Sequence, residues 1–145
     1  MKIIKNQKKD YTCGLVCVQH AFTKLTHNPI TQAKLEELIG TNNGGYSHVE
    51  LVRLCGMLGL RTETTEGLNK VIKLDQSEER VIILGWTPFY EHYSVFEGII
   101  RTPEGDFVSL NEPDSPSYVA MYNMKDFKKC WKDSDANRWA LIITK

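Results

Sequence analysis

Along the first half of the chain, apolar residues recur every three or four positions, which is the spacing of one face of an α-helix. This pattern predicts a first helix from Cys13 to Leu25, with Thr12 as its N-cap. Two further helices are predicted within the segments Thr31–Gly40 and Ser47–Gly59. In the second of these, Glu50 has the spacing of a capping-box partner for the serine that begins the segment.

From residue 81 onward the pattern changes to short apolar runs and to alternation, both of which are typical of β-strands. The expected elements are strands over 81–84, 92–100, 107–110 and 139–144, a helix over 124–131 capped by Asn123, and a further helical stretch over 68–74. Residues 101–105 contain the turn that joins the second and third strands. The predicted fold is therefore α+β, with a helical N-terminal lobe packed on a C-terminal antiparallel β-sheet.

Length and charge narrow the range of functions. A chain of 145 residues without repeats or linker-like stretches fits a single domain over residues 1–145. Eighteen basic and eighteen acidic side chains balance, so nothing favours a nucleic-acid partner. The sequence contains neither a signal-peptide core nor an apolar run of membrane-spanning length. We therefore expect a cytoplasmic protein, with signal-independent secretion left open, and the sequence does not determine its oligomeric state.

The strongest chemical signal is Cys13, which stands where the first helix is predicted to begin. The partial positive charge at a helix N-terminus favours the nucleophilic thiolate form of such a cysteine. Gln7, six residues upstream, can donate a hydrogen bond to the oxyanion that forms when a thiolate attacks a carbonyl. The other cysteines (Cys17, Cys55 and Cys130) fit packing positions and have no metal-ligand spacing, so we expect neither a metal nor another cofactor.

A catalytic thiol needs a base, and His92 is the best candidate because it opens a strand just after a bulky loop. The alternatives are weaker. His20 is seven residues beyond Cys13 on the same predicted helix, which is about 10 Å along the helix axis. His27 fits a helix end, and His48, beside a glycine-rich loop, is a reserve candidate.

The base itself must be held in orientation, and the predicted hairpin supplies a partner. If strands 92–100 and 107–111 pair in an antiparallel way, the end of the second strand lies beside the start of the first. Asn111 would then reach the far ring nitrogen of His92 and complete a Cys-His-Asn arrangement. Asp114, beyond a proline, competes for the same role.

These residues resemble, in the right order over nearly the whole chain, the bacteriocin-processing double-glycine cysteine peptidases, a papain-like family. The matching segments are Gln7 followed by Cys13–Val18, Leu35–Leu38, Gly44 with Ser47, Leu58–Leu60, His92–Val95 and Asp126–Trp131. The resemblance implies that Cys13 is the nucleophile, His92 the base and Gln7 the oxyanion-hole donor.

Three departures from the family pattern stand out. The family usually has Asp-Pro where this chain reads Asn111-Glu-Pro, and it often has Asp where Thr12 stands. No transporter segment follows, so a free-standing domain is expected.

The sequence thus predicts a cysteine peptidase that cleaves a peptide or protein substrate through a thioester intermediate, with cleavage after a Gly-Gly type motif as one option. The same acyl-enzyme chemistry would also serve a transpeptidase or a side-chain deamidase. A catalytically silent, peptide-binding domain of the same fold is the alternative from another functional class.

Overall fold

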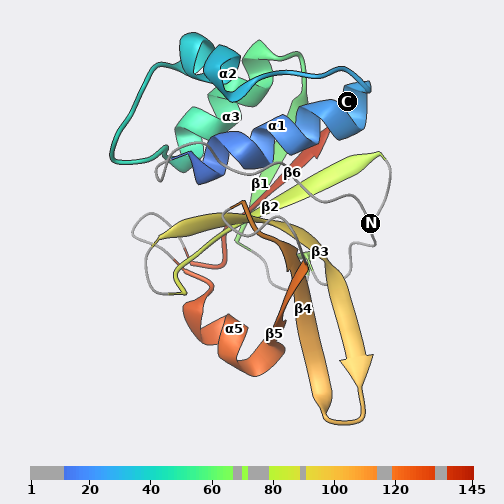
Figure 1. Ribbon diagram of the computed structural model, residues 1–145. Helices are drawn as coiled ribbons and strands as arrows, with labels where there is room; N and C mark the ends of the chain where they lie inside the picture. Colours follow the sequence, from blue (N-terminus) through green and yellow to red (C-terminus); the bar gives the residue numbers. More distant parts are fainter. Residues whose placement is uncertain (1–11, 67–69, 72–78, 89–90, 114–118, 133–136) are drawn as a thin grey trace.

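The structure, a computed structural model, describes residues 12–66, 70–71, 79–88, 91–113, 119–132 and 137–145. Helices α1, α2 and α3 cover one face of an antiparallel β-sheet, and α5 packs on the other face (Figure 1). The helices are α1 (Cys13–Thr26), α2 (Gln32–Ile39), α3 (His48–Met57) and α5 (Met124–Cys130). The strands are β1 (Arg61–Thr65), β2 (Arg80–Trp86), β3 (His92–Thr102), β4 (Gly105–Asn111), β5 (Val119–Asn123) and β6 (Ala140–Thr144).

The described strands form a sheet with the order β1-β6-β2-β3-β4-β5, in which every neighbouring pair is antiparallel. The last strand, β6, therefore lies between β1 and β2 rather than at an edge. β3 and β4 form a hairpin that extends away from the rest of the sheet, with a bulge between Phe96 and Gly98 (Figure 1).

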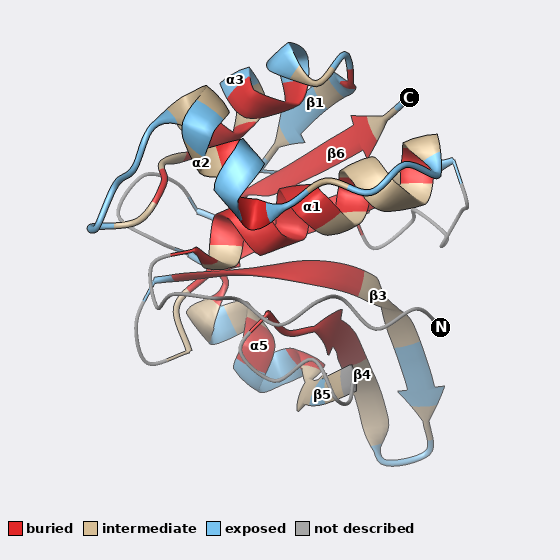
Figure 2. Ribbon diagram, turned by 45° about the horizontal axis from the view of Figure 1, so that its top comes forward, coloured by how far each residue is buried: buried red, intermediate tan, exposed pale blue. Residues whose placement is uncertain are grey.

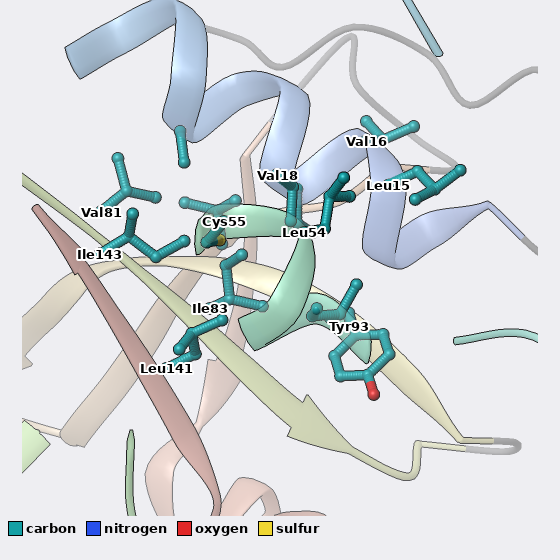
Figure 3. Close-up of a cluster of buried hydrophobic side chains, with 14 of the residues drawn as sticks. Leu15, Val16, Val18, Leu54, Cys55, Val81, Ile83, Tyr93, Leu141 and Ile143 are labelled. Carbon is teal, nitrogen blue, oxygen red and sulfur yellow. The ribbon is translucent and has the colours of Figure 1, made fainter. Parts of the chain in front are cut away.

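Alternation along the central strands gives the molecule two apolar cores. One core lies between the sheet and α1–α3 and includes Ile83 and Leu141, as Figure 3 shows. The other lies between the opposite face and α5 and includes Leu84 and Ile142. Because both faces are covered, β2 and β6 are continuous apolar runs rather than half-polar strands.

The two ends of β3 differ in burial. The first five residues of this strand, His92–Phe96, are buried, whereas the end near the hairpin turn is exposed (Figure 2). In both ribbon views the N-terminal end of α1 lies over this buried start of β3. The arrangement therefore brings the first residues of α1 and of β3 into the same region.

The structure confirms all the predicted helices that fall on described residues, and in α3 both halves of the capping box are formed between Ser47 and Glu50. One detail differs at α1. Thr12 is its N-cap residue, and its carbonyl accepts from the Val16 N–H at 3.0 Å, but its side chain makes no capping hydrogen bond. The prediction of a helical stretch over 68–74 lies largely outside the described residues.

All the predicted strands are also present, with β2 extending two residues further than expected, to Trp86. Two strands were not predicted, β1 and β5. Both lie at the edges of the sheet, so each has a strand partner on one side only within the described residues.

The start of α1 packs closely enough on its neighbours to make a prediction about Gly14. A Cβ at this position would lie 3.0 Å from Leu51 Cδ2 and 3.1 Å from Tyr93 Cδ2, and both neighbours are buried. Helix propensity alone would favour alanine over glycine by about 1 kcal/mol. Overpacking a filled core costs about 1–3 kcal/mol, so we expect Gly14→Ala to lower the free energy of unfolding. Urea denaturation measures the change.

The matched control is Gly56→Ala in α3, because a Cβ there meets nothing within 4 Å. It should stabilise the protein by about 0.5–1 kcal/mol. If both variants stabilised the protein equally, the close contact of α1 with Leu51 and Tyr93 would be refuted.

Candidate active site

Cys13 is the first residue of α1, and its side chain is half-buried against the apolar core under α1–α3. The N–H groups of a first helical turn have no intrahelical partner, and they carry the positive end of the helix dipole. The thiol therefore lies at the positive end of the α1 dipole. Part of the Cys13 surface is exposed.

His92 is the first residue of β3 and pairs with Trp86 of β2. Only 5% of its surface is exposed. Its Nε2 lies 2.7 Å from Oε2 of Glu112, the residue that follows β4. The imidazole is thus fixed from two sides, by the strand that carries it and by a buried carboxylate from the neighbouring strand's end.

The pKa of His92 reflects these neighbours. Burial lowers this pKa, but hydrogen bonding to Cys13 and Glu112, together with the charges of both groups, outweighs burial and raises the pKa to about 10. The imidazole is therefore held as an imidazolium at neutral pH. The carboxylate of Glu112, whose Oε2 lies 2.7 Å from Nε2, stabilises the positive charge on the ring.

The second carboxylate oxygen of Glu112 is also engaged. Ser94 Oγ donates a hydrogen bond to Glu112 Oε1 at 2.8 Å, and Trp86 Nε1 donates to Ser94 Oγ at 2.9 Å. Ser94 and His92 are two residues apart in β3, so they lie on the same face of the strand. Ser94 is fully buried and Trp86 is 2% exposed.

Asn111, which the sequence predicted as the partner of His92, has a different position. It pairs with Val95, so its side chain lies on the face of the sheet opposite to that of His92 and Ser94. Its amide donates to the carboxylate of Glu97. The pKa of Glu97 is raised, because burial outweighs the opposing effects of the Asn111 hydrogen bond and the Lys24 charge. Glu112, which sequence reasoning overlooked, makes the contact with His92 instead.

The remaining histidines lie apart from this cluster. His27 ends α1 in a left-handed conformation, with its N–H bonded to the Thr23 carbonyl. His48 is buried and stacks on Trp139 with a 3.8 Å ring separation. His20 lies within α1, about two helical turns beyond Cys13. None of these three placements matches that of a base for the thiol.

The other cysteines differ from Cys13 in their surroundings. Cys17 and Cys55 are fully buried, and burial raises the pKa of Cys55 to about 12. A buried thiol of this kind stays protonated and inert. Cys130 is half-buried at the end of α5, on the far side of the sheet.

Two sequence candidates, Gln7 and Asp114, lie outside the residues that the structure describes. Across the described ranges, no three or more His, Cys, Asp or Glu side chains are grouped so that they could hold a metal ion. Over those same ranges, every helix is too short or too polar to cross a lipid bilayer.

Comparison with solved structures finds the same fold in other peptidase domains. The peptidase domain of Streptococcus ComA, a bi-functional ABC transporter of a quorum-sensing pathway, matches with a TM-score of 0.77 and 18% identity, over 99% of this chain and 98% of that one. A double-glycine-motif protease from an AMS/PCAT transporter, solved with its leader peptide, matches with a TM-score of 0.72 and 16% identity, over 97% and 89% of the two chains.

The N-terminal peptidase C39-like domain of a toxin secretion ATP-binding protein from Vibrio parahaemolyticus matches with a TM-score of 0.64 and 15% identity, over 96% of this chain and 98% of that chain. No curated protein sequence matches the chain. At these identities the structural matches establish the fold.

The fold and family together define the class of protein, a papain-like cysteine peptidase. The model of the peptidase C39 family matches residues 1–135, nearly the whole sequence. The chain belongs to the peptidase C39 family, and the resemblance read from its motifs is confirmed.

Proposed function

We propose that this peptidase cleaves peptide bonds through a Cys13–His92–Glu112 triad, in which Glu112 takes the orienting role expected for Asn111. The observation that carries the proposal is the 2.7 Å contact between His92 Nε2 and Glu112 Oε2. Cys13 acts on the same imidazole, because it also raises the pKa of His92. With Nε2 engaged by Glu112, Nδ1 is the nitrogen that exchanges a proton with the Cys13 sulfur.

The first half of the reaction forms an acyl-enzyme. The Cys13 thiolate attacks the scissile carbonyl carbon, so a C–S bond forms and the carbonyl oxygen becomes an oxyanion. The Cys13 backbone N–H and the Gln7 side chain donate hydrogen bonds to this oxyanion. The His92 imidazolium then gives its proton to the leaving amine, the C–N bond breaks, and a thioester remains.

The second half restores the enzyme. Neutral His92 takes a proton from a water molecule, whose oxygen attacks the thioester carbonyl. The C–S bond then breaks, the acid product leaves, and the thiolate–imidazolium pair forms again. Glu112 keeps its hydrogen bond to the ring throughout and stabilises the imidazolium each time it appears.

The substrate that we propose is a peptide with a Gly-Gly type motif before the cleaved bond. Support comes from the family and from the AMS/PCAT neighbour, which is a double-glycine-motif protease bound to a leader peptide. We propose that residues 1–145 act as a single peptidase domain.

The test uses synthetic peptides that carry a Gly-Gly junction and matched peptides in which both glycines are replaced by alanine. We expect mass spectrometry to show cleavage directly after the second glycine, and at least about a tenfold preference over the alanine peptide, because an added methyl group that overpacks a fitted site costs about 1–3 kcal/mol. Cleavage of neither peptide, with Cys13 intact and unmodified, would argue against this substrate class.

The same experiment separates the reaction types that share a thioester. Hydrolysis gives two peptides with a free acid and a free amine. An added amine would appear in the product of a transpeptidase, and a deamidase would convert a side-chain amide to an acid without breaking the chain.

A further inference from the structure

We infer that Ser94 is a positioning residue for this peptidase: its hydroxyl holds the Glu112 carboxylate in the rotation that keeps Oε2 on His92, and Trp86 in turn holds the hydroxyl. The inference rests on the proposed triad and extends it by two buried residues that act through Glu112. The contacts form a continuous series from Trp86 Nε1 to Ser94 Oγ at 2.9 Å, from Ser94 Oγ to Glu112 Oε1 at 2.8 Å, and from Glu112 Oε2 to His92 Nε2 at 2.7 Å.

The direction of each hydrogen bond in this series is fixed by chemistry. An indole N–H can only donate, and an ionised carboxylate can only accept. The Ser94 hydroxyl has a single hydrogen, so while it accepts from Trp86 it must donate that hydrogen to Glu112. The hydroxyl therefore has one orientation, in which it donates its hydrogen to the Glu112 carboxylate.

Burial prevents solvent from replacing these contacts. Ser94 is fully buried, Trp86 is 2% exposed and Glu112 is 6% exposed. Without the hydroxyl, the indole N–H and one carboxylate oxygen would lose a buried partner, which costs more than the loss of an exposed hydrogen bond. Ser94 is also rigidly placed, because its backbone pairs with Leu84 in the centre of the sheet.

A glutamate needs such an anchor more than an aspartate does. Glutamate has one more rotatable bond, and the torsion at its carboxylate is broad and poorly restricted by itself. Hydrogen bonds to both oxygens, from Ser94 on one and His92 on the other, define this torsion. Of the described titratable groups, those acting on His92 are Cys13 from α1 and Glu112 beyond β4, so a looser Glu112 weakens one of its two stabilising contacts.

The first variant that tests the inference is Ser94→Ala. We expect kcat for a cleaved peptide to fall roughly 10- to 100-fold, the effect of losing a hydrogen bond to a charged group, with KM unchanged. The alkaline limit of activity, set by loss of the His92 proton, should move to lower pH. Cys13 alkylation by iodoacetamide at neutral pH should slow in parallel, a readout that needs no substrate.

Two further variants keep the test independent of folding defects. Trp86→Phe keeps an aromatic ring, although a smaller one, and removes the indole N–H, so it should move the alkaline limit in the same direction by a smaller amount. Ser109→Ala removes another buried serine hydroxyl, which lies on β4 and outside this series. It should leave kcat and the alkaline limit of activity unchanged. Thermal unfolding of all three variants reports the folded fraction.

A double-mutant cycle with Glu112→Gln distinguishes the possible failures. If Ser94 acts through Glu112, Ser94→Ala should have little further effect on kcat once Glu112 is changed. Full additivity, or an unmoved alkaline limit in Ser94→Ala, would overturn the inference while the triad stood. If Glu112→Gln itself left kcat and the pH profile unchanged, the proposed triad would fail, and this inference with it.

Discussion

Replacing Cys13 with serine is expected to lower kcat for peptide cleavage by about 10⁴-fold or more, because the nucleophile and base of such a site act as one unit. Serine has nearly the same shape, so the half-buried position should stay filled. A hydroxyl at this position is far less acidic than a thiol, and it does not form an ion pair with His92. The measurement is single-turnover cleavage of the Gly-Gly peptide by wild type and variant.

Cys130→Ser is the matched control, because Cys130 is also a half-buried free thiol but lies on α5 across the sheet. It should cleave at the wild-type rate. Peptide mapping after brief treatment with iodoacetamide should find the label on Cys13 in the control and in wild type. Equal activity of the Cys13 and Cys130 variants would show that the chemistry lies elsewhere.

The helical half of the fold was predictable because its signals are local. Thr31, Ser47 and Asn123 each accept a hydrogen bond from the backbone of the helix they precede, as the sequence indicated. The two missed strands lack such signals. β1 reads Arg-Thr-Glu-Thr-Thr, with no apolar residue, since an edge strand whose residues are exposed or half-buried needs none. Its threonines were the available sign of a strand.

The sequence predicted that the β3–β4 hairpin brings His92 close to the end of β4. It did not predict which side chain at that end contacts His92. Side chains in a strand alternate between faces, so a shift of one residue selects the opposite face. The register Val95–Asn111 places Asn111 on the face of Val95. Only a known register assigns the contact to Glu112, and the bulge beside Phe96 makes that register hard to infer from sequence.

Glu112→Gln is expected to lower kcat by about 100-fold or more, because it removes a charged hydrogen-bond partner from a buried imidazolium. The amide keeps the shape of the carboxylate, so folding should be preserved. It does not keep the negative charge that helps to raise the pKa of His92 to about 10. The imidazolium is then less stable, and the neutral ring appears at lower pH.

The sign of the pH effect follows from the role of the proton. Leaving-group departure needs protonated His92, so activity declines as the pH rises through the pKa of this residue. In wild type the alkaline limb should therefore lie near pH 10, and in Glu112→Gln it should lie at lower pH. A profile of kcat/KM against pH for both proteins measures the difference.

The comparison variant is Asn111→Ala, which tests the partner that the sequence favoured. Loss of the Asn111 amide leaves the half-buried Glu97 carboxylate without that donor, so stability should fall. Per folded molecule, however, kcat and the alkaline limb should stay close to wild type, because Asn111 lies on the opposite face from His92. The reverse result, a shifted limb in Asn111→Ala and an unshifted limb in Glu112→Gln, would return the orienting role to the amide and place Glu112 outside the mechanism.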